Sequence, residues 1–269
     1  MKKHIFTVCI IYAVIAGYIA SHFYTESLAY IPPAAARQDI SAVVERSPAE
    51  LTEEDYRFIF EQTGLGRAAV SGLSDLSLIY DYQESFFFPV EFECEKNSPI
   101  SFEERIQGKT VKLAPLEDGD ILVTSSAHVF SWRNGHAAIV VDADSGTTLE
   151  AVVIGKNSKT QHISKWTKYP NFAVLRLKDA DKNERAAIAR FAMDNLYNIP
   201  YNVFIGLYPM KYSRTGSVTG TQCAHLIWLA YAAYGYDIDS SRGLIVTPQD
   251  ILKSDRFEIV QVYGMRMSK

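Results

Sequence analysis

The chain has 269 residues, of which 48% are hydrophobic and 22% are charged, the composition of an ordinary globular protein with one or two domains. Its formal net charge is −4, and no basic run is longer than two residues, so a nucleic-acid partner is not expected. The sequence contains no internal repeat and no low-complexity segment, which excludes solenoid and fibrous architectures.

The N-terminus has the pattern of a targeting segment. A short basic start, Met1–His4, precedes an uncharged stretch over residues 5–20, and the small residues Ser27 and Ala29 suit cleavage by a signal peptidase. The uncharged stretch is shorter than the roughly 20 residues of a full membrane span. We therefore expect residues 1–29 to be a signal peptide or a retained signal anchor that would hold the protein at a membrane. Either way, the body of the protein is expected to be exported to the periplasm, the cell envelope or the exterior.

Residues 30–110 are expected to form a linker and an N-terminal extension. A capping box at Thr52 predicts a short helix that ends at Gly64. Residues 65–73 predict a second short helix. The aromatic run over residues 86–92 is expected to be extended and partly buried.

From residue 111 onward the pattern changes to strands followed by helices. The alternation and the turn at residues 142–146 predict a hairpin of two strands, His136–Asp142 and Thr147–Val153. Further elements are expected as strands at 121–123, 159–163, 172–177 and 257–263, and as helices after Asp181, from Cys223 to Gly235 and after Thr247. The order predicts an α+β domain over residues 111–269, with a small antiparallel sheet packed on helices.

Cys223 is the candidate nucleophile. With Thr221 as the expected N-cap, Cys223 lies in the first turn of its helix, where unpaired backbone N–H groups favour a thiolate and can stabilise an oxyanion. Two other interpretations stay open. Cys223 begins the apolar face of the helix, so it could be a buried structural thiol, and it could form a disulfide with Cys94 in an oxidising compartment.

His136 is the candidate base among the six histidines. It opens an apolar strand, whereas His225 is too close to Cys223 on one helix to face it, and His128 is expected in a polar loop. Glu150 lies on the partner strand of the hairpin, within two positions of His136, where it would orient the ring and stabilise the imidazolium. The alternatives are a core histidine with satisfied hydrogen bonds and a solvent-facing glutamate.

Other chemistries have weaker sequence support. Cys223 and His225 diverge on their helix, and no Cys-x-x-Cys or His-Glu-x-x-His spacing occurs, so we expect no metal and no cofactor. The segment Gly64–Arg67 lacks the preceding strand of a phosphate-binding loop, and no Gly-x-Ser-x-Gly motif of a serine hydrolase is found.

Several motifs appear in an order typical of one group of enzymes: Glu117–Leu122, Gly135-His136 at a strand start, Leu149–Ala151, Asn198–Asn202, Gln222–Trp228 and Thr247–Ile251. Together they resemble the circularly permuted papain-fold hydrolases, the YaeF/YiiX-like relatives of NlpC-type cell-wall peptidases and of lecithin:retinol acyltransferase. The resemblance covers about residues 111–255 and implies a permuted papain-like fold. It also implies a catalytic set of Cys223, His136 and Glu150, and it places Tyr201 in the substrate pocket.

The residues and the resemblance together predict an exported cysteine amidase or peptidase whose substrate is a peptide or amide, with peptidoglycan peptides suggested by the compartment. Two alternatives belong to other classes. A lipid-directed thiol acyltransferase or esterase is favoured if the aromatic segments 86–92 and 201–212 line an apolar channel. A non-catalytic binding module is favoured if Cys223 is sealed in the interior or bonded to Cys94.

Overall fold

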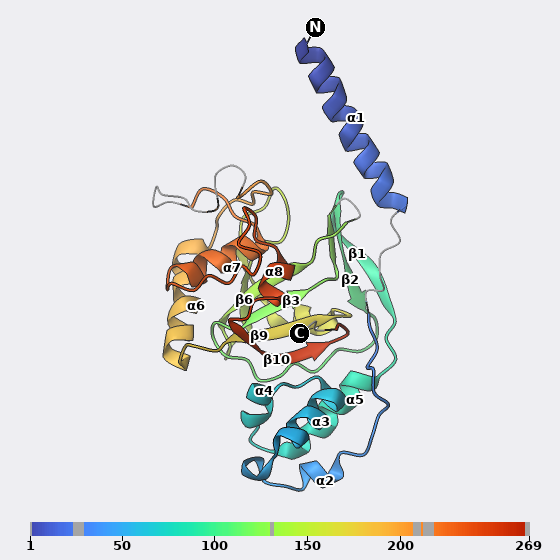
Figure 1. The fold of residues 1–269 in the computed structure, drawn as a ribbon, viewed down its shortest axis with the longest axis vertical. Coiled ribbons are helices and arrows are strands. Elements are labelled where there is room, and N and C mark those ends of the chain that lie inside the picture. Colours follow the sequence, from blue (N-terminus) through green and yellow to red (C-terminus); the bar gives the residue numbers. More distant parts are fainter. Residues whose placement is uncertain (1, 24–29, 130–131, 207–210, 212–217, 267–269) are drawn as a thin grey trace.

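Two antiparallel sheets and several helices make up the part of the chain that the structure describes, so the α+β class is confirmed (Figure 1). The structure is a computed structural model, and it describes residues 2–23, 30–129, 132–206, 211 and 218–266. Its α-helices are α1 (Lys2–Phe23), α2 (Ser41–Val44), α3 (Glu53–Thr63), α4 (Arg67–Ser71), α5 (Ile79–Phe87), α6 (Lys182–Leu196), α7 (Cys223–Ala232) and α8 (Pro248–Leu252).

Three of the expected helix starts have the predicted capping interaction. The side chains of Thr52, Asp181 and Thr247 each accept a hydrogen bond from a backbone N–H in the first turn of α3, α6 and α8. One prediction in the N-terminal half is wrong. Phe86 and Phe87 belong to the end of α5 and are not extended, because the apolar face of this helix packs on α3.

A six-stranded antiparallel sheet forms the centre of the fold, in the order β10-β9-β3-β6-β7-β8. Its strands are β3 (Ile121–Thr124), β6 (His136–Asp142), β7 (Thr147–Glu150), β8 (Lys159–His162), β9 (Phe172–Leu177) and β10 (Phe257–Tyr263). The sequence predicted all six, although β7 ends at Glu150 rather than Val153. Helices α6 and α7 cover one face of this sheet, and the N-terminal helices lie beyond the other (Figure 1).

The alternation of side chains explains why the central sheet carries helices on both faces. Ala137 and Ile139 of β6 point into the core with α6 and α7, whereas Ala138 and Val140 point into the core with the N-terminal helices. All four are fully buried. A strand without a polar face reads as a continuous apolar run, as seen here in the sequence.

Gly64 and Gly66 fix the N-terminal helices against the central sheet. A Cβ on either residue would meet a β10 carbonyl oxygen, that of Val262 at 1.9 Å and that of Ile259 at 1.8 Å. Their backbones instead hydrogen bond to β10, through Gly64 O with Val262 N and Gly66 N with Val260 O. The glycines that failed to match a phosphate-binding loop thus serve a close backbone approach.

A second sheet was not predicted. It has the order β1-β2-β4-β5 and consists of β1 (Phe92–Ser98), β2 (Ser101–Ile106), β4 (Ala127–Val129) and β5 (Trp132–Arg133). It joins part of the expected N-terminal extension, residues 92–106, to the segment that leads into β6. This sheet and the start of β6 border the candidate site described below.

Helix α1 lies apart from the rest of the fold in Figure 1. Among the described residues, no helix combines the length and the apolar character required to cross a bilayer. The expected cleavage residues Ser27 and Ala29 lie outside the described residues, as do Tyr208 and Tyr212 of the aromatic segment 201–212.

Candidate active site

The sulfur of Cys223 lies at the first residue of α7, a position set by an unexpected cap. The N-cap is Gln222, not Thr221: the Gln222 Oε1 accepts a hydrogen bond from the Ala224 backbone N–H at 2.8 Å. Gln222 Nε2 donates to the Val246 carbonyl at 2.6 Å, which locks this side chain in place. Thr221 is instead within hydrogen-bond distance of the His225 ring, at 3.1 Å. The cap sits one residue later than predicted, so Cys223 is closer to the positive end of the helix.

The imidazole of His136 faces this sulfur. Gly135 precedes it with a positive φ of 73°, and a Cβ there would lie 2.7 Å from the Thr124 carbonyl oxygen, so the turn into β6 needs glycine. His136 is 3% exposed, and its interaction with the Cys223 thiol is among the causes that raise its pKa. Its Nε2 is 2.8 Å from the Glu150 carboxylate, which leaves Nδ1 for the thiol.

Glu150 is fully buried and surrounded by hydrogen-bond donors. Strand β7 pairs with β6 so that Ile139 lies opposite Leu149, which places Glu150 two positions from His136, as the turn predicted. In addition to the contact with the His136 ring, the Glu150 oxygens accept four hydrogen bonds. The donors are Thr148 Oγ1 at 2.7 Å, Gln161 Nε2 at 3.0 Å, Trp166 Nε1 at 3.0 Å and Lys165 Nζ at 3.1 Å. A buried carboxylate with this many donors stays ionised and holds the ring in one orientation.

The two charges support each other. Burial disfavours a charged His136 ring, but the hydrogen bonds to Cys223 and Glu150 and the Glu150 charge outweigh it and raise the pKa of His136 to about 9. Burial likewise opposes ionisation of Glu150, yet Lys165 and His136 hold the pKa of this carboxyl well below its ordinary value. The ring is therefore an imidazolium at neutral pH, next to the candidate nucleophile.

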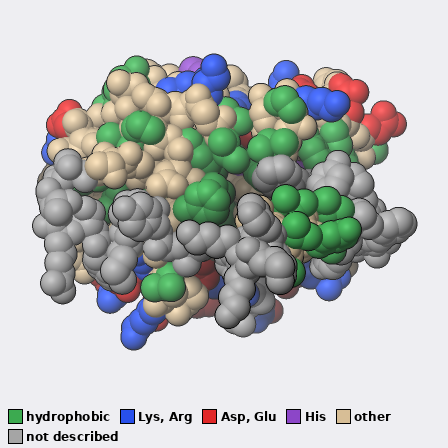
Figure 2. Space-filling model, turned by 90° about the horizontal axis from the view of Figure 1, so that it is seen from above, with side chains coloured by type: hydrophobic (Ala, Val, Ile, Leu, Met, Phe, Trp, Pro, Cys, Tyr) green, Lys and Arg blue, Asp and Glu red, His purple; other side chains and the backbone are tan. Residues whose placement is uncertain are grey.

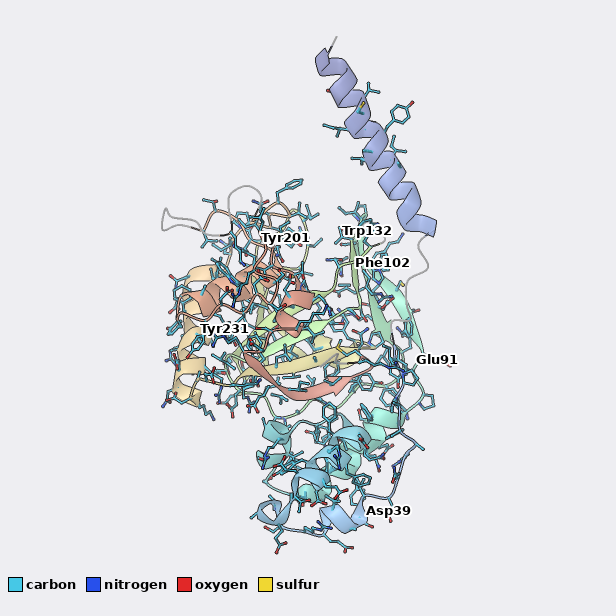
Figure 3. All side chains as sticks on the ribbon, in the orientation of Figure 1. Asp39, Glu91, Phe102, Trp132, Tyr201 and Tyr231 are labelled. Atoms are coloured by element: carbon cyan, nitrogen blue, oxygen red, sulfur yellow. The ribbon has the colours of Figure 1, made fainter. Side chains whose placement is uncertain are left out.

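A narrow crevice gives access to this group. Cys223, His136 and Tyr201 line it on one side, and residues of the second sheet, Phe102 and Val129 among them, line it on the other. Figure 3 shows Tyr201 and Phe102 rising from these two sides at the same end of the molecule. In the view onto that end, the described hydrophobic side chains gather mainly near the centre, and charged side chains lie mainly towards the edge (Figure 2).

Tyr201 sits where the resemblance expected it. It is joined to the Cys223 segment by a short parallel bridge with Thr221, and burial and the nearby Cys223 raise the pKa of its hydroxyl. The hydroxyl is therefore a neutral donor at any physiological pH, next to the sulfur. Sequence reasoning missed the wall opposite, because the polar strands β1 and β2 carry no period that marks them as part of a site.

Other cysteines and histidines take different places from those considered. Cys94 is an exposed free thiol on β1, and Cys223 is a buried free thiol, so the two form no disulfide. His128 is not in a polar loop: it is buried in β4 and lies 3.1 Å from the Glu104 carboxylate. His225 is held by Thr221 and the Lys211 carbonyl, and it does not belong to the described lining of the crevice.

Within the described ranges, no group of three His, Cys, Asp or Glu side chains has a metal-binding arrangement.

Comparisons with known proteins give little further information. No family model matches the chain, and no curated protein matches it. Among solved structures, the chain is similar to the crystal structure of metalloprotein YiiX from Escherichia coli O157:H7, with 16% sequence identity and a TM-score of 0.41. The match covers 54% of this chain and 97% of that one. A likeness at this level does not indicate the activity of this chain.

Proposed function

We propose that the protein is a cysteine hydrolase that cleaves an amide bond, an amidase or peptidase. The observation that carries the proposal is that the Cys223 thiol and the His136 ring line one crevice and interact there, while the ring hydrogen bonds to the buried Glu150 carboxylate. A nucleophile, a proton carrier and a group that orients it are the parts that acyl transfer requires.

The geometry gives each group one step. The Cys223 sulfur attacks the amide carbonyl, and the negative charge on its oxygen is stabilised by backbone N–H groups at the start of α7. His136 then gives its proton to the leaving amine, which departs and leaves a thioester. Water attacks the thioester after His136 has taken a proton from it, and the acid leaves as the thiolate re-forms. Glu150 holds the ring and its charge throughout.

Tyr201 and Gln222 have supporting roles in this proposal. The Tyr201 hydroxyl lies beside the sulfur and lines the crevice, where it would contact the substrate carbonyl. Gln222 cannot take that role, because its amide nitrogen donates to the Val246 carbonyl. Its contribution is to fix the helix start, and with it the sulfur.

The proposal extends to fold family and location. A nucleophile that follows its histidine in the chain, on a helix that packs against the histidine strand, supports a permuted papain-like arrangement over residues 111–269. The targeting pattern of residues 1–29 supports export, with membrane anchoring through residues 5–20 if the segment is kept. Export makes peptidoglycan peptides the first substrates to test.

The two alternatives have less support. The lipid-directed acyltransferase or esterase was favoured if the aromatic run 86–92 helped to line an apolar channel. Phe86 and Phe88 instead pack on Tyr263, and neither belongs to the described lining of the crevice. A binding module was favoured if Cys223 was sealed in the interior or bonded to Cys94. Cys223 is buried, but it forms no disulfide, is 5% exposed and lines the crevice together with His136.

The test is amine release from a panel of acyl amides, dipeptides and peptidoglycan peptides by the wild-type protein, C223A and C94A. We expect activity in the wild type and in C94A, and a loss of at least about 10³-fold in C223A. The exposed Cys94 is the matched control, since its removal also deletes one thiol. Equal activity of C223A and C94A would refute the proposal.

A further inference from the structure

A second cavity opens beside the crevice. Its volume is about 470 Å³, and it shares the lining residues Asn97, Glu103 and Val152 with the crevice that holds Cys223 and His136. The crevice itself is much smaller, with a volume of about 20 Å³. The larger cavity falls within the size range of small-molecule sites and adjoins the crevice through these shared residues, so a substrate part next to the scissile amide would lie in it.

The lining of this cavity is cationic. Four positive side chains, those of Arg105, Lys156, Lys159 and Lys165, face one carboxylate, that of Glu103. The chain as a whole carries a net charge of −4, so the excess of positive charge is a local feature. A cavity with one sign of charge concentrates ligands of the other sign.

The four cations divide into two kinds. Arg105 and Lys165 are largely committed: Arg105 pairs with Glu103, and Lys165 lies 3.5 Å from Glu103 and 3.1 Å from Glu150. Lys156 and Lys159 are exposed, and no carboxylate lies within ion-pair distance of either among the described residues. Their charge is therefore available to a ligand.

The backbone fixes these two lysines relative to the reacting group. Lys159 lies opposite Glu150 in the β7–β8 pair, and the Lys156 carbonyl accepts a hydrogen bond from the Tyr201 N–H at 3.1 Å. The cavity therefore lies on the Glu150 side of His136. In a peptide the free carboxylate belongs to the leaving-amine half and the free amine to the acyl half, so a cationic cavity next to the reacting group suits the leaving half.

We propose that this cavity binds a carboxylate carried by the leaving-amine half of the substrate, so that the amine released is an amino acid or a peptide with a free C-terminus. The inference rests on the proposed function, since it assigns the two halves of an amide. Val152 and Val153 are the apolar members of the lining, beside amides and charges, which suits a polar peptide end better than an acyl chain. Hydrogen bonds to charged groups then add specificity.

The experiment compares N-acetyl-Ala-Ala with its C-terminal carboxamide, two probes that differ in a single charge. Release of alanine or alaninamide is measured as kcat/KM for the wild type, for the double variant K156M/K159M and for the control double variant K168M/K182M. Lys168 and Lys182 are also exposed but do not line the cavity. We expect the wild type and the control to prefer the carboxylate about tenfold, with a smaller ratio at high salt. The ratio falls towards one in K156M/K159M.

Equal rates on the two probes in the wild type, or a preference that survives in K156M/K159M, would overturn the carboxylate site. A third probe, N-acetyl-phosphoethanolamine, tests a lipid headgroup: a preference for it over both peptides also overturns the assignment. If the wild type cleaves none of these probes, the proposed function is not supported. The carboxylate site is then tested by measuring the affinity of C223A for the two peptides. Tighter binding of the carboxylate peptide by C223A, with no such preference in C223A/K156M/K159M, supports the site.

Discussion

Two buried histidine–glutamate pairs border the same crevice, one on each sheet, and their difference shows what makes such a pair reactive. His136 and Glu150 belong to β6 and β7, with 2.8 Å between Nε2 and the carboxylate. His128 and Glu104 belong to β4 and β2, with 3.1 Å between the corresponding atoms. By burial and by distance the two pairs are nearly alike.

Their neighbours differ. The Glu104 carboxylate accepts two hydrogen bonds from Arg133, at 2.8 and 2.9 Å, and the His128 ring stacks on Phe102. Burial opposes ionisation of Glu104, but His128 and Arg133 lower its pKa to about 2. The negative charge of Glu104 is thus neutralised mainly by the Arg133 guanidinium. The His136 ring interacts with the Cys223 thiol, so this pair can carry a proton to and from a nucleophile.

Removing each ring in turn is the strongest way to test this contrast. H136A deletes the proton carrier, and we expect kcat/KM for amide cleavage to fall by about 10²–10⁴-fold. H128Q leaves the Glu104–Arg133 pair in place, so we expect a loss below about tenfold, together with a lower midpoint in thermal unfolding. Similar losses of kcat/KM in the two variants would mean that the pairs are not functionally distinct.

The Glu150 charge gives a prediction about pH. The active form has a protonated His136, so activity is lost as pH rises through the pKa of that ring, about 9. In E150Q the hydrogen bond and the charge that raise this pKa are weakened or absent. The alkaline limb of the kcat/KM profile therefore moves to lower pH. E104Q, the matched change in the other pair, is expected to leave the limb in place, and a shift of equal size there would contradict the assignment.

The same linkage applies to folding. A raised His136 pKa adds stability that is complete below the unfolded value, about 6.5, and is lost as pH rises through about 9. Thermal melts of the wild type across this window should fall more steeply than those of E150Q.

Substitution of Lys165 is expected to shift the alkaline limb least, and in the direction opposite to that of E150Q. Its charge lies 3.1 Å from Glu150 and lowers the pKa of His136. K165M removes that repulsion, so the alkaline limb is expected to move to higher pH with a change in kcat/KM below about tenfold. A shift to lower pH would show that Lys165 acts mainly by holding Glu150, not through the charge on the ring.

Cys223, His136 and Glu150 could be predicted from the sequence because the patterns that mark them are local. The turn after β6 set the register that brings Glu150 to His136, and a helix start marked Cys223. Gln222 was missed as the cap because glutamine is not among the usual capping residues. Its role depends on the Val246 carbonyl, which is distant in the chain.

The surroundings of the site could not be predicted for the same physical reason. Lys165 reaches Glu150 from a 3-10 turn, η3 (Ile163–Lys168), whose path follows from tertiary packing. The pairing of β2 with β4 buries Glu103 and Glu104, although adjacent acidic residues read as a solvated strand. Neither contact leaves a periodic pattern, since each depends on segments that meet only in the folded chain.

The most direct test of the central claim compares the two cysteines that remain if the targeting segment is removed. Cys94 is exposed and Cys223 is 5% exposed, so accessibility alone favours Cys94. Burial and Glu104 raise the pKa of Cys94, whereas Cys223 faces the His136 imidazolium. Brief treatment with iodoacetamide at neutral pH, followed by peptide mass spectrometry, should label Cys223 faster than Cys94, and the order should reverse in H136A. Faster labelling of Cys94 in the wild type would contradict the account.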